Sequence, residues 1–540
     1  MTISSALDKN ENCFSTAAFS GSNPLATIAF DAEGIKAKLL NLEQPCHVVR
    51  IANQIGMIQI DPLQLGTVEP IMTVPSLPLQ QLGDPSFLAW HGVKMAYAAG
   101  AMAGGIASED LVIALGKAGI LSSFGSGGLG RDRITAAIHR IQDALPQGPY
   151  AFNLLHSPND AAMERSTVEL YLKHHIRTVE ASAFINLTPS LVYYRAAGLQ
   201  LSPNQQIKIQ NKIIAKLSRR EVATQFLQPA PAQILKALVI QGLISEQQAQ
   251  LAAQVPMADD ITVEADSGGH TDNRPLVCLL PAILALRDEI QAQYSYRTPV
   301  RIGVAGGIST PPSALAALMM GAAYVVTGSV NQSCLEAAAS PHTKRLLAEA
   351  EMHDVIMAPA ADMFEMGVKL QVLKKGTLFP LRAQKLFDLY KTYDAIEDIP
   401  QAERHRLEQQ IFQRPLDEVW QETQAYLAAH KPEKLAKAAN NPKLKMALIF
   451  RWYLGLSSRW SKTGECDRTA DYQIWCGPAM GAFNNWVKDT YLEAPDQRRV
   501  VDVALHIMRG AAFLYRVNAL KLQGLNMPAH YGQYRPIPLE

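Results

Sequence analysis

An apolar, β-branched run ends in a group of reactive and small residues in the segment ITVEADSGGHTD, residues 261–272. His270 stands where the expected strand gives way to a loop. An imidazole at such a place can donate a proton near neutral pH or polarise a carbonyl group. We therefore predict that His270 is catalytic. The alternative is a histidine that only hydrogen-bonds Asp266 or Asp272.

The residues that precede this histidine are suited to lining a ligand. Ser267, Gly268 and Gly269 are small, so the backbone can lie directly against a bound molecule. Glu264 and Asp266 share one face of the expected strand, because strand side chains repeat with a period of two. We expect one or both carboxylates to hold ligand hydroxyls or to orient the imidazole.

Two later segments, VAGGIST and VTGSVNQ, place glycine and other small residues near the expected start of a helix. Backbone N–H groups at a helix start are unpaired, and together with the positive end of the helix they bind phosphate. The predicted phosphate ligands are Gly306, Gly307, Gly328 and Ser329.

Three further features could face a ligand. Asn153 lies inside the apolar run AFNLLH, and a buried amide needs hydrogen-bond partners, which a flavin or base edge or the neighbouring backbone would supply. Lys216 could face an anionic cofactor edge or reach solvent. The small residues of GAMAGGIAS, 100–108, would admit a planar ligand or form only a close turn. No segment has metal-ligand spacing, so we predict no metal site.

The elements that must position these residues are eight short apolar runs, most of them separated by roughly 25 to 40 residues. The runs begin at Val93, Gly119, Tyr150, Ile176, Lys212, Ile261, Val300 and Ala323. Continuous apolar runs suit parallel strands that are covered by helices. Eight β/α units in roughly 245 residues match an α/β (β/α)8 barrel. An open doubly wound sheet would carry its glycines after the first strand, whereas here they follow several strands.

The chain divides into three predicted regions. Residues 1–90 form an N-terminal subdomain, and residues 91–345 form the barrel with an insertion at about 228–258. Residues 346–540 are mostly helical by periodicity and contain five of the six tryptophans. In such a barrel the ligand lies at the carboxyl ends of the strands, so the candidate residues should converge there.

The composition narrows the classes of function. Lysine and arginine number 50 and aspartate and glutamate 49, which argues against a nucleic-acid scaffold. Six cysteines without a C-x-x-C pair favour reduced thiols in the cytoplasm. The N-terminus has no signal-peptide pattern. The charge-free stretch 310–335 is interrupted by proline and glycine, so we expect a buried barrel segment and no membrane span.

The order of five motifs carries a family resemblance. This chain contains AMAGG, AFNLL, EADSGGH, AGGI and TGS in that order. The order resembles that in the nitronate monooxygenase-like flavoprotein barrels, which include flavin-dependent enoyl-acyl-carrier-protein reductases. The C-terminal stretches FRWYLGLSSRW and DYQIWCGPAMGAFNNWV resemble the PfaD subfamily. Proteins of that subfamily are separate enoyl reductases of polyunsaturated fatty acid synthases, and close relatives serve polyketide synthases.

The resemblance implies FMN as cofactor, with its ring beside Ala101, Met102 and Ala103 and near Asn153. It also implies that NADPH or NADH reduces the FMN and that His270 assists saturation of the 2,3 double bond of an enoyl thioester. Relatives read E-A-G-G-H where this chain has A-D-S-G-G-H, so Glu264 is displaced. Together with the motif residues, the candidate cofactor-binding set is Ala101, Met102, Ala103, Asn153, Lys216, Glu264, Ser267, Gly268, Gly269, Gly306, Gly307, Gly328 and Ser329.

The resemblance further implies a substrate carried by acyl carrier protein, which is generally acidic. The basic residues Lys374, Lys375, Arg382 and Lys385 could form a docking face, or they could be an ordinary solvated helix surface. A homodimer is a further expectation. Three alternatives stay open: a nitronate-oxidising flavoenzyme, a non-catalytic synthase subunit, and a flavin-free barrel that binds a phosphorylated sugar.

Overall fold

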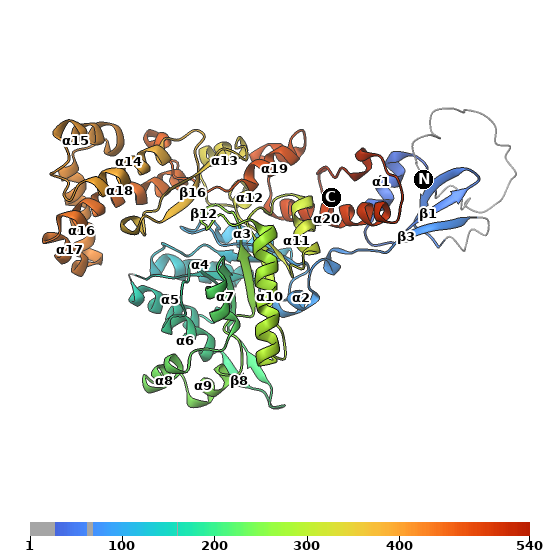
Figure 1. The fold of residues 1–540 in the computed structure, drawn as a ribbon, viewed down its shortest axis with the longest axis horizontal. Helices are drawn as coiled ribbons and strands as arrows, with labels where there is room; N and C mark the ends of the chain where they lie inside the picture. Colours follow the sequence, from blue (N-terminus) through green and yellow to red (C-terminus); the bar gives the residue numbers. More distant parts are fainter. Residues whose placement is uncertain (1–27, 62–67, 159, 540) are drawn as a thin grey trace.

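A closed barrel of eight parallel strands forms the centre of the molecule (Figure 1). The computed structural model describes residues 28–61, 68–158 and 160–539. The barrel strands are β4 (Tyr97–Ala99), β5 (Leu121–Phe124), β6 (Ala151–Leu155), β7 (Thr178–Ser182), β10 (Lys212–Leu217), β11 (Asp260–Glu264), β13 (Arg301–Ala305) and β14 (Val325–Thr327). Each of the eight apolar runs supplies one strand, and the predicted (β/α)8 barrel is confirmed.

Helices cover the outside of the barrel. They are α3 (Glu109–Lys117), α4 (Arg131–Ala144), α5 (Ala161–Lys173), α6 (Pro189–Ala197), α7 (Arg220–Leu227), α10 (Leu276–Tyr294) and α11 (Pro311–Met319), and the four-residue α12 (Ser329–Gln332) follows β14. Alternate strand residues such as Val179, Ile261 and Val304 are buried in the large core shared with these helices. The stretch expected as an insertion contains α8 (Ala232–Ile240) and α9 (Glu246–Ala252), and β8 (Leu199–Leu201) pairs with β9 (Ile207–Ile209) nearby.

The amino-terminal end of the barrel is closed by the short helix α2 (Pro85–His91). Phe87 of this helix stacks on Tyr324, with the ring centroids 4.2 Å apart. His91 lies 2.8 Å from Asp260, the first residue of β11, and Asp260 also binds Arg301, the first residue of β13. These contacts pack side chains at the amino-terminal end, so the ligand site is expected at the carboxyl ends of the strands.

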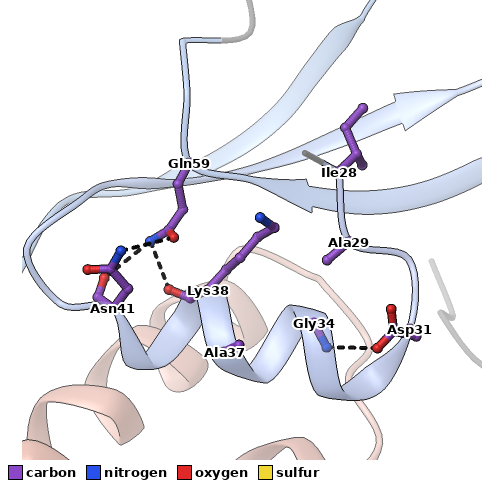
Figure 2. Close-up of a pocket in the computed structure, with 8 residues that line it drawn as sticks. All are labelled: Ile28, Ala29, Asp31, Gly34, Ala37, Lys38, Asn41 and Gln59. Carbon is purple, nitrogen blue, oxygen red and sulfur yellow. Dashed lines mark hydrogen bonds between the residues drawn. The ribbon is translucent and has the colours of Figure 1, made fainter. Parts of the chain in front are cut away.

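The first described residues form a small subdomain against the last long helix. It contains α1 (Ala32–Leu40) and a three-stranded sheet of β2 (Gln54–Ile58), β1 (Cys46–Ile51) and β3 (Glu69–Val74). Their apolar side chains share a core with α20 (Val500–Leu522). A hollow lined by Asp31, Lys38 and Gln59 lies in this subdomain (Figure 2). It lies outside the barrel and is not the site expected at the strand ends.

The region after the barrel is mostly helical, as predicted. Its helices before α20 are α13 (Pro341–Ala348), α14 (Phe379–Thr392), α15 (Gln401–Leu407), α16 (Leu416–His430), α17 (Pro432–Ala439), α18 (Pro442–Thr463) and α19 (Ala479–Val487). It also contains β15 (Val355–Pro359) and β16 (Lys369–Leu373), and β16 pairs with β12 (Gly269–His270), which follows barrel strand β11. No helix in the described ranges is long and apolar enough to cross a membrane.

Candidate functional site

A charged group on three neighbouring strands occupies the inside of the barrel near its open end. The Nζ atom of Lys216 lies 3.2 Å from Glu264 Oε1 and 3.9 Å from Glu180 Oε1. Burial opposes the charge of Lys216, but attraction by Glu264 and then Glu180 outweighs it and raises its pKa. Lys216 was expected to face a cofactor edge or solvent. The structure places its ammonium between two carboxylates.

Asn153 is buried on β6 next to this group. Its Nδ2 donates to the backbone carbonyl of Glu180 and to the hydroxyl of Ser182, both at 3.0 Å. Neighbouring protein atoms therefore satisfy the donors of this amide. Within the described ranges Asn153 Oδ1 accepts no hydrogen bond, so an acceptor is left for a ligand.

The loop after β4 holds the three residues expected to lie beside a planar ring. The N–H of Ala101 donates to both carboxylate oxygens of Glu180, at 3.1 and 3.3 Å. The carbonyl of Met102 accepts from Ala107 and lies where a side chain at Gly125 would begin, only 1.7 Å from an ideal Cβ. Sequence reasoning missed Glu180, although its carboxylate interrupts the apolar run IRTVEASA just as Lys216 interrupts its own run.

The two predicted phosphate loops differ in how much space their glycines leave. Cβ atoms built at Gly307 and Gly328 would meet nothing within 4 Å. A Cβ at Gly306 would lie 2.7 Å from the carbonyl of Ala265, so that glycine is required by close packing against the end of β11. The backbone at Gly307 and Gly328 is thus open to a ligand. Gly306 instead allows its loop to pack against the end of β11.

Two hydroxyls belong to the same loops. The Oγ of Ser329 accepts a hydrogen bond from the N–H of Gly477 at 3.1 Å, which leaves its own hydrogen to donate. The Oγ of Ser309 is buried and has no partner among the described residues. Open backbone together with a free donor and an orphaned hydroxyl fits a phosphate group.

The small residues after β11 contact protein on the side where a side chain would stand. A Cβ at Gly268 would lie 2.8 Å from the backbone N of Cys476, and Gly269 pairs with Gln371 of β16. The hydroxyl of Ser267 donates to Glu264 at 3.1 Å. The loop leaves the barrel to join the C-terminal sheet, so the side-chain face of Gly268 is covered by that region.

The acidic partners expected for His270 are also different. Asp266 accepts from Gln371 at 2.7 Å and Asn273 at 3.0 Å, and it therefore anchors the C-terminal region and does not orient the imidazole. Glu264 is held by Lys216. Neither carboxylate of the predicted strand face forms a hydrogen bond with His270.

The imidazole pairs instead with a residue of the C-terminal region. Its Nε2 lies 3.1 Å from Asp362 Oδ1, and the two side chains are 38% and 55% exposed. Burial would raise the pKa of Asp362, but the hydrogen bond from His270 and the positive charges of His270 and Arg451 together lower it. Asp362 follows 92 residues after His270, and no local pattern marks it.

The predicted docking cluster consists largely of cations that already have partners. Arg382 pairs with the buried Asp471, and Lys385 lies 2.8 Å from Glu403. Lys375 donates to the carbonyl of Glu349 at 2.6 Å. Two of the four cations are thus paired with carboxylates, and a third is hydrogen-bonded to a backbone carbonyl.

Comparison with protein families adds three matches along the chain. The nitronate monooxygenase family matches residues 88–384. The N-terminal domain of the fatty acid synthase subunit PfaD matches residues 22–62. The inserted helical domain of [acyl-carrier-protein] S-malonyltransferase matches residues 393–472, which include α16, α17 and α18.

Individual proteins are similar over most of this chain. It is 52% identical to a polyunsaturated fatty acid synthase subunit of Thraustochytrium sp., over 82% of this chain and 30% of that protein. The polyketide biosynthesis protein PksE of Bacillus subtilis is 43% identical, over 84% of this chain and 58% of that protein. The chain thus spans less than two thirds of these curated relatives.

A solved structure has the same architecture. The enoyl reductase domain of MlnA, from the macrolactin biosynthesis cluster of Bacillus amyloliquefaciens, is 39% identical with a TM-score of 0.79. The match covers 82% of this chain and 100% of that chain.

Proposed function

Because the chain belongs to the nitronate monooxygenase family, a family of oxidoreductases, we propose that it is an FMN-dependent enoyl reductase that acts in trans within a polyunsaturated fatty acid or polyketide synthase. The observation that carries this proposal is the similarity, over the whole of the solved domain, to the enoyl reductase domain of MlnA. The relatives named as synthase subunits and polyketide biosynthesis proteins support the pathway.

The residues at the barrel mouth would hold FMN in two parts. Gly307, Gly328 and the hydroxyl of Ser329 would bind the phosphate, since they offer open backbone and a free donor. The ring would lie by the loop that begins at Ala101, above Lys216 and its carboxylates. When bound, FMN reduced by NADPH or NADH supplies the hydride.

The chain's own residues would then handle charge and protons. Saturation of the 2,3 double bond adds hydride to the β-carbon and a proton to the α-carbon of the enoyl thioester. Negative charge builds on the thioester oxygen between these steps, and preorganised donors lower its energy. His270, held at Nε2 by Asp362, would donate the proton or stabilise the enolate.

The predicted regions take separate roles in this proposal. Residues 91–345 would bind the cofactor, and residues 346–540 would cover the mouth and receive the acyl carrier protein. The docking surface would lie in other parts of that region, because Lys375, Arg382 and Lys385 already have partners within the protein. Residues 1–90 would form a separate N-terminal subdomain. The protein would act in the cytoplasm as a homodimer.

An anaerobic titration tests the proposed activity. The purified protein is reduced with NADPH and then titrated with a short enoyl thioester such as crotonyl-CoA. We expect the absorbance of oxidised flavin to return in proportion to the thioester added, while the saturated butyryl thioester has no effect. Protein that takes up no FMN would contradict the proposal and would favour a non-catalytic subunit or a phosphorylated-sugar barrel.

The second candidate is a nitronate-oxidising flavoenzyme, which the description of the matched family favours. It would share the cofactor but use oxygen as the electron acceptor. Nitronate that reduces the flavin anaerobically, with no reoxidation by the enoyl thioester, would replace the first proposal by this one.

A further inference from the structure

Glu180 is a buried carboxylate that the proposed chemistry leaves without a role. It is the third residue of β7, with its side chain 7% exposed. It pairs in register with Asn153 of β6 and Ile214 of β10, and Lys216 lies two residues further along β10. A carboxylate at this depth needs partners that offset the loss of hydration.

The partners of Glu180 come from two sides of the barrel. Lys216 lies 3.9 Å away, but its closer carboxylate is Glu264 at 3.2 Å. The N–H of Ala101 donates to both oxygens of Glu180, at 3.1 and 3.3 Å. The shortest contacts of the Glu180 carboxylate are therefore to the loop after β4.

This contact spans a large part of the barrel. Strands β4 and β7 are separated by β5 and β6 in the closed order, so the side chain reaches across the interior to meet Ala101. The loop that begins at Ala101 is the one expected beside a planar cofactor. A buried N–H bound to a carboxylate forms a charge-assisted hydrogen bond, and removing the acceptor leaves the N–H unsatisfied.

We propose that Glu180 is a positioning residue that holds the loop of residues 101–105 across the barrel mouth in the shape that receives the cofactor ring. The proposal rests on the function proposed above. Lys216 supports this arrangement by balancing part of the negative charge of Glu180 and Glu264. The carboxylate acts through the loop backbone and takes no part in proton transfer.

Two substitutions separate positioning from charge. Glu180→Ala removes the acceptor, whereas Glu180→Gln keeps an oxygen for the Ala101 N–H and removes the charge. Glu164→Gln is the matched control, because Glu164 is equally buried at 3% but binds His156 outside the barrel interior. The measurements on full-length protein are FMN affinity by fluorescence quenching and amide hydrogen exchange of a peptide containing residues 101–105.

We expect Glu180→Ala to weaken FMN binding by about tenfold or more and to speed exchange in this peptide by a similar factor, consistent with the loss of one charge-assisted hydrogen bond. Glu180→Gln should stay within about threefold of wild type in both measurements, because its oxygen still accepts the hydrogen bond. Glu164→Gln should match wild type in both.

Two results would overturn the inference. One is unchanged exchange in Glu180→Ala, because the loop would then not depend on the carboxylate. The other is an equal loss of FMN affinity in Glu180→Ala and Glu180→Gln, because charge and not position would then matter. Wild-type protein that binds no FMN would refute the proposed function instead, while exchange would still decide the role of Glu180.

Discussion

At the level of single residues, the proposed chemistry depends on an imidazole in a loop of the barrel. The side chain of His270 is 38% exposed, and its partner Asp362 is exposed as well. Its loss should therefore disturb the fold little. The candidate phosphate ligands and the residues expected beside the ring come from other loops.

Replacing His270 with alanine should lower enoyl reduction by roughly a hundredfold, the usual scale for loss of a general acid. FMN content should stay at the wild-type level. Turnover with crotonyl-CoA and the flavin spectrum measure the two effects. Unchanged turnover would show that the proton comes from elsewhere.

Asp362 should matter through the same imidazole. Asp362→Asn removes the charge that holds Nε2, and we expect turnover to fall by about tenfold with FMN retained, because the orientation of the ring is then less defined. Glu365→Gln is the control. It lies in the same segment but binds Arg451 at 3.0 Å, and its turnover should equal that of wild type.

At the level of elements, the two phosphate loops contain glycines with different physical requirements. Gly306 has a φ of 83° and no room for a Cβ, whereas Gly328 has a φ of −134° and open space. A side chain at Gly306 would thus meet both backbone strain and a clash. A side chain at Gly328 would meet no protein atom within 4 Å and would enter the space proposed for the phosphate.

The two alanine variants should separate stability from binding. Gly306→Ala should lower the free energy of unfolding of the FMN-free protein by about 1 to 3 kcal/mol. Gly328→Ala should keep that stability and weaken FMN binding by about tenfold. Thermal unfolding and FMN titration measure these effects. Equal FMN affinity in Gly328→Ala and wild type would place the phosphate elsewhere.

A pH-dependent contact joins the loops that follow β10 and β11. Asp272 accepts from Arg219 at 2.9 Å and from Ser218, and the Arg219 hydrogen bond is the main reason that its pKa falls to about 2. A carboxyl with a lower pKa in the folded state stabilises the protein above its unfolded pKa. That stability is lost as the pH falls through about 2.

The variant Asp272→Asn tests this contact. At neutral pH it should be about 1 to 2 kcal/mol less stable than wild type, a value reduced by the exposure of Arg219. The difference should shrink as the pH falls from 4 to 2. Urea unfolding at several pH values measures it, and a constant difference would contradict the argument.

At the level of the whole molecule, the C-terminal region is joined to the barrel mouth by backbone contacts. β12 pairs with β16, Gly477 donates to Ser329, and Gly268 lies against Cys476. The region after the barrel therefore forms part of the wall of the candidate site.

Gly268→Ala tests this junction. Its Cβ would lie 2.8 to 3.0 Å from backbone atoms of Cys476, which cannot move aside as a flexible side chain would. We expect faster proteolysis between the barrel and the C-terminal region, together with weaker FMN binding. Gly242→Ala, in the turn between α8 and α9, is a partial control, since a Cβ there meets nothing within 4 Å although its φ of 69° adds local strain. A proteolysis pattern identical to that of wild type would show that Gly268→Ala does not loosen the junction. Any loss of FMN binding would then have another cause.

The sequence by itself determined the barrel and the location of its candidate site. Eight continuous apolar runs predicted the eight strands, because strands buried on both faces need apolar residues at nearly every position. The ends of the runs could be placed as well, because glycine and polar residues interrupt the apolar pattern there. Those positions include Gly307, Gly328 and His270. These features are local, and local patterns can be recognised along the chain.

Only the tertiary structure decided which side chains face each other. Asp266 has the same residue type and spacing as an orienting carboxylate, yet Gln371 from the C-terminal region occupies it. Asp362 and Glu180 bind atoms 92 and 79 residues away in sequence. Such pairs depend on how the chain folds back over the barrel. Their members have no characteristic spacing in the sequence, so the contact between them could not be predicted from it.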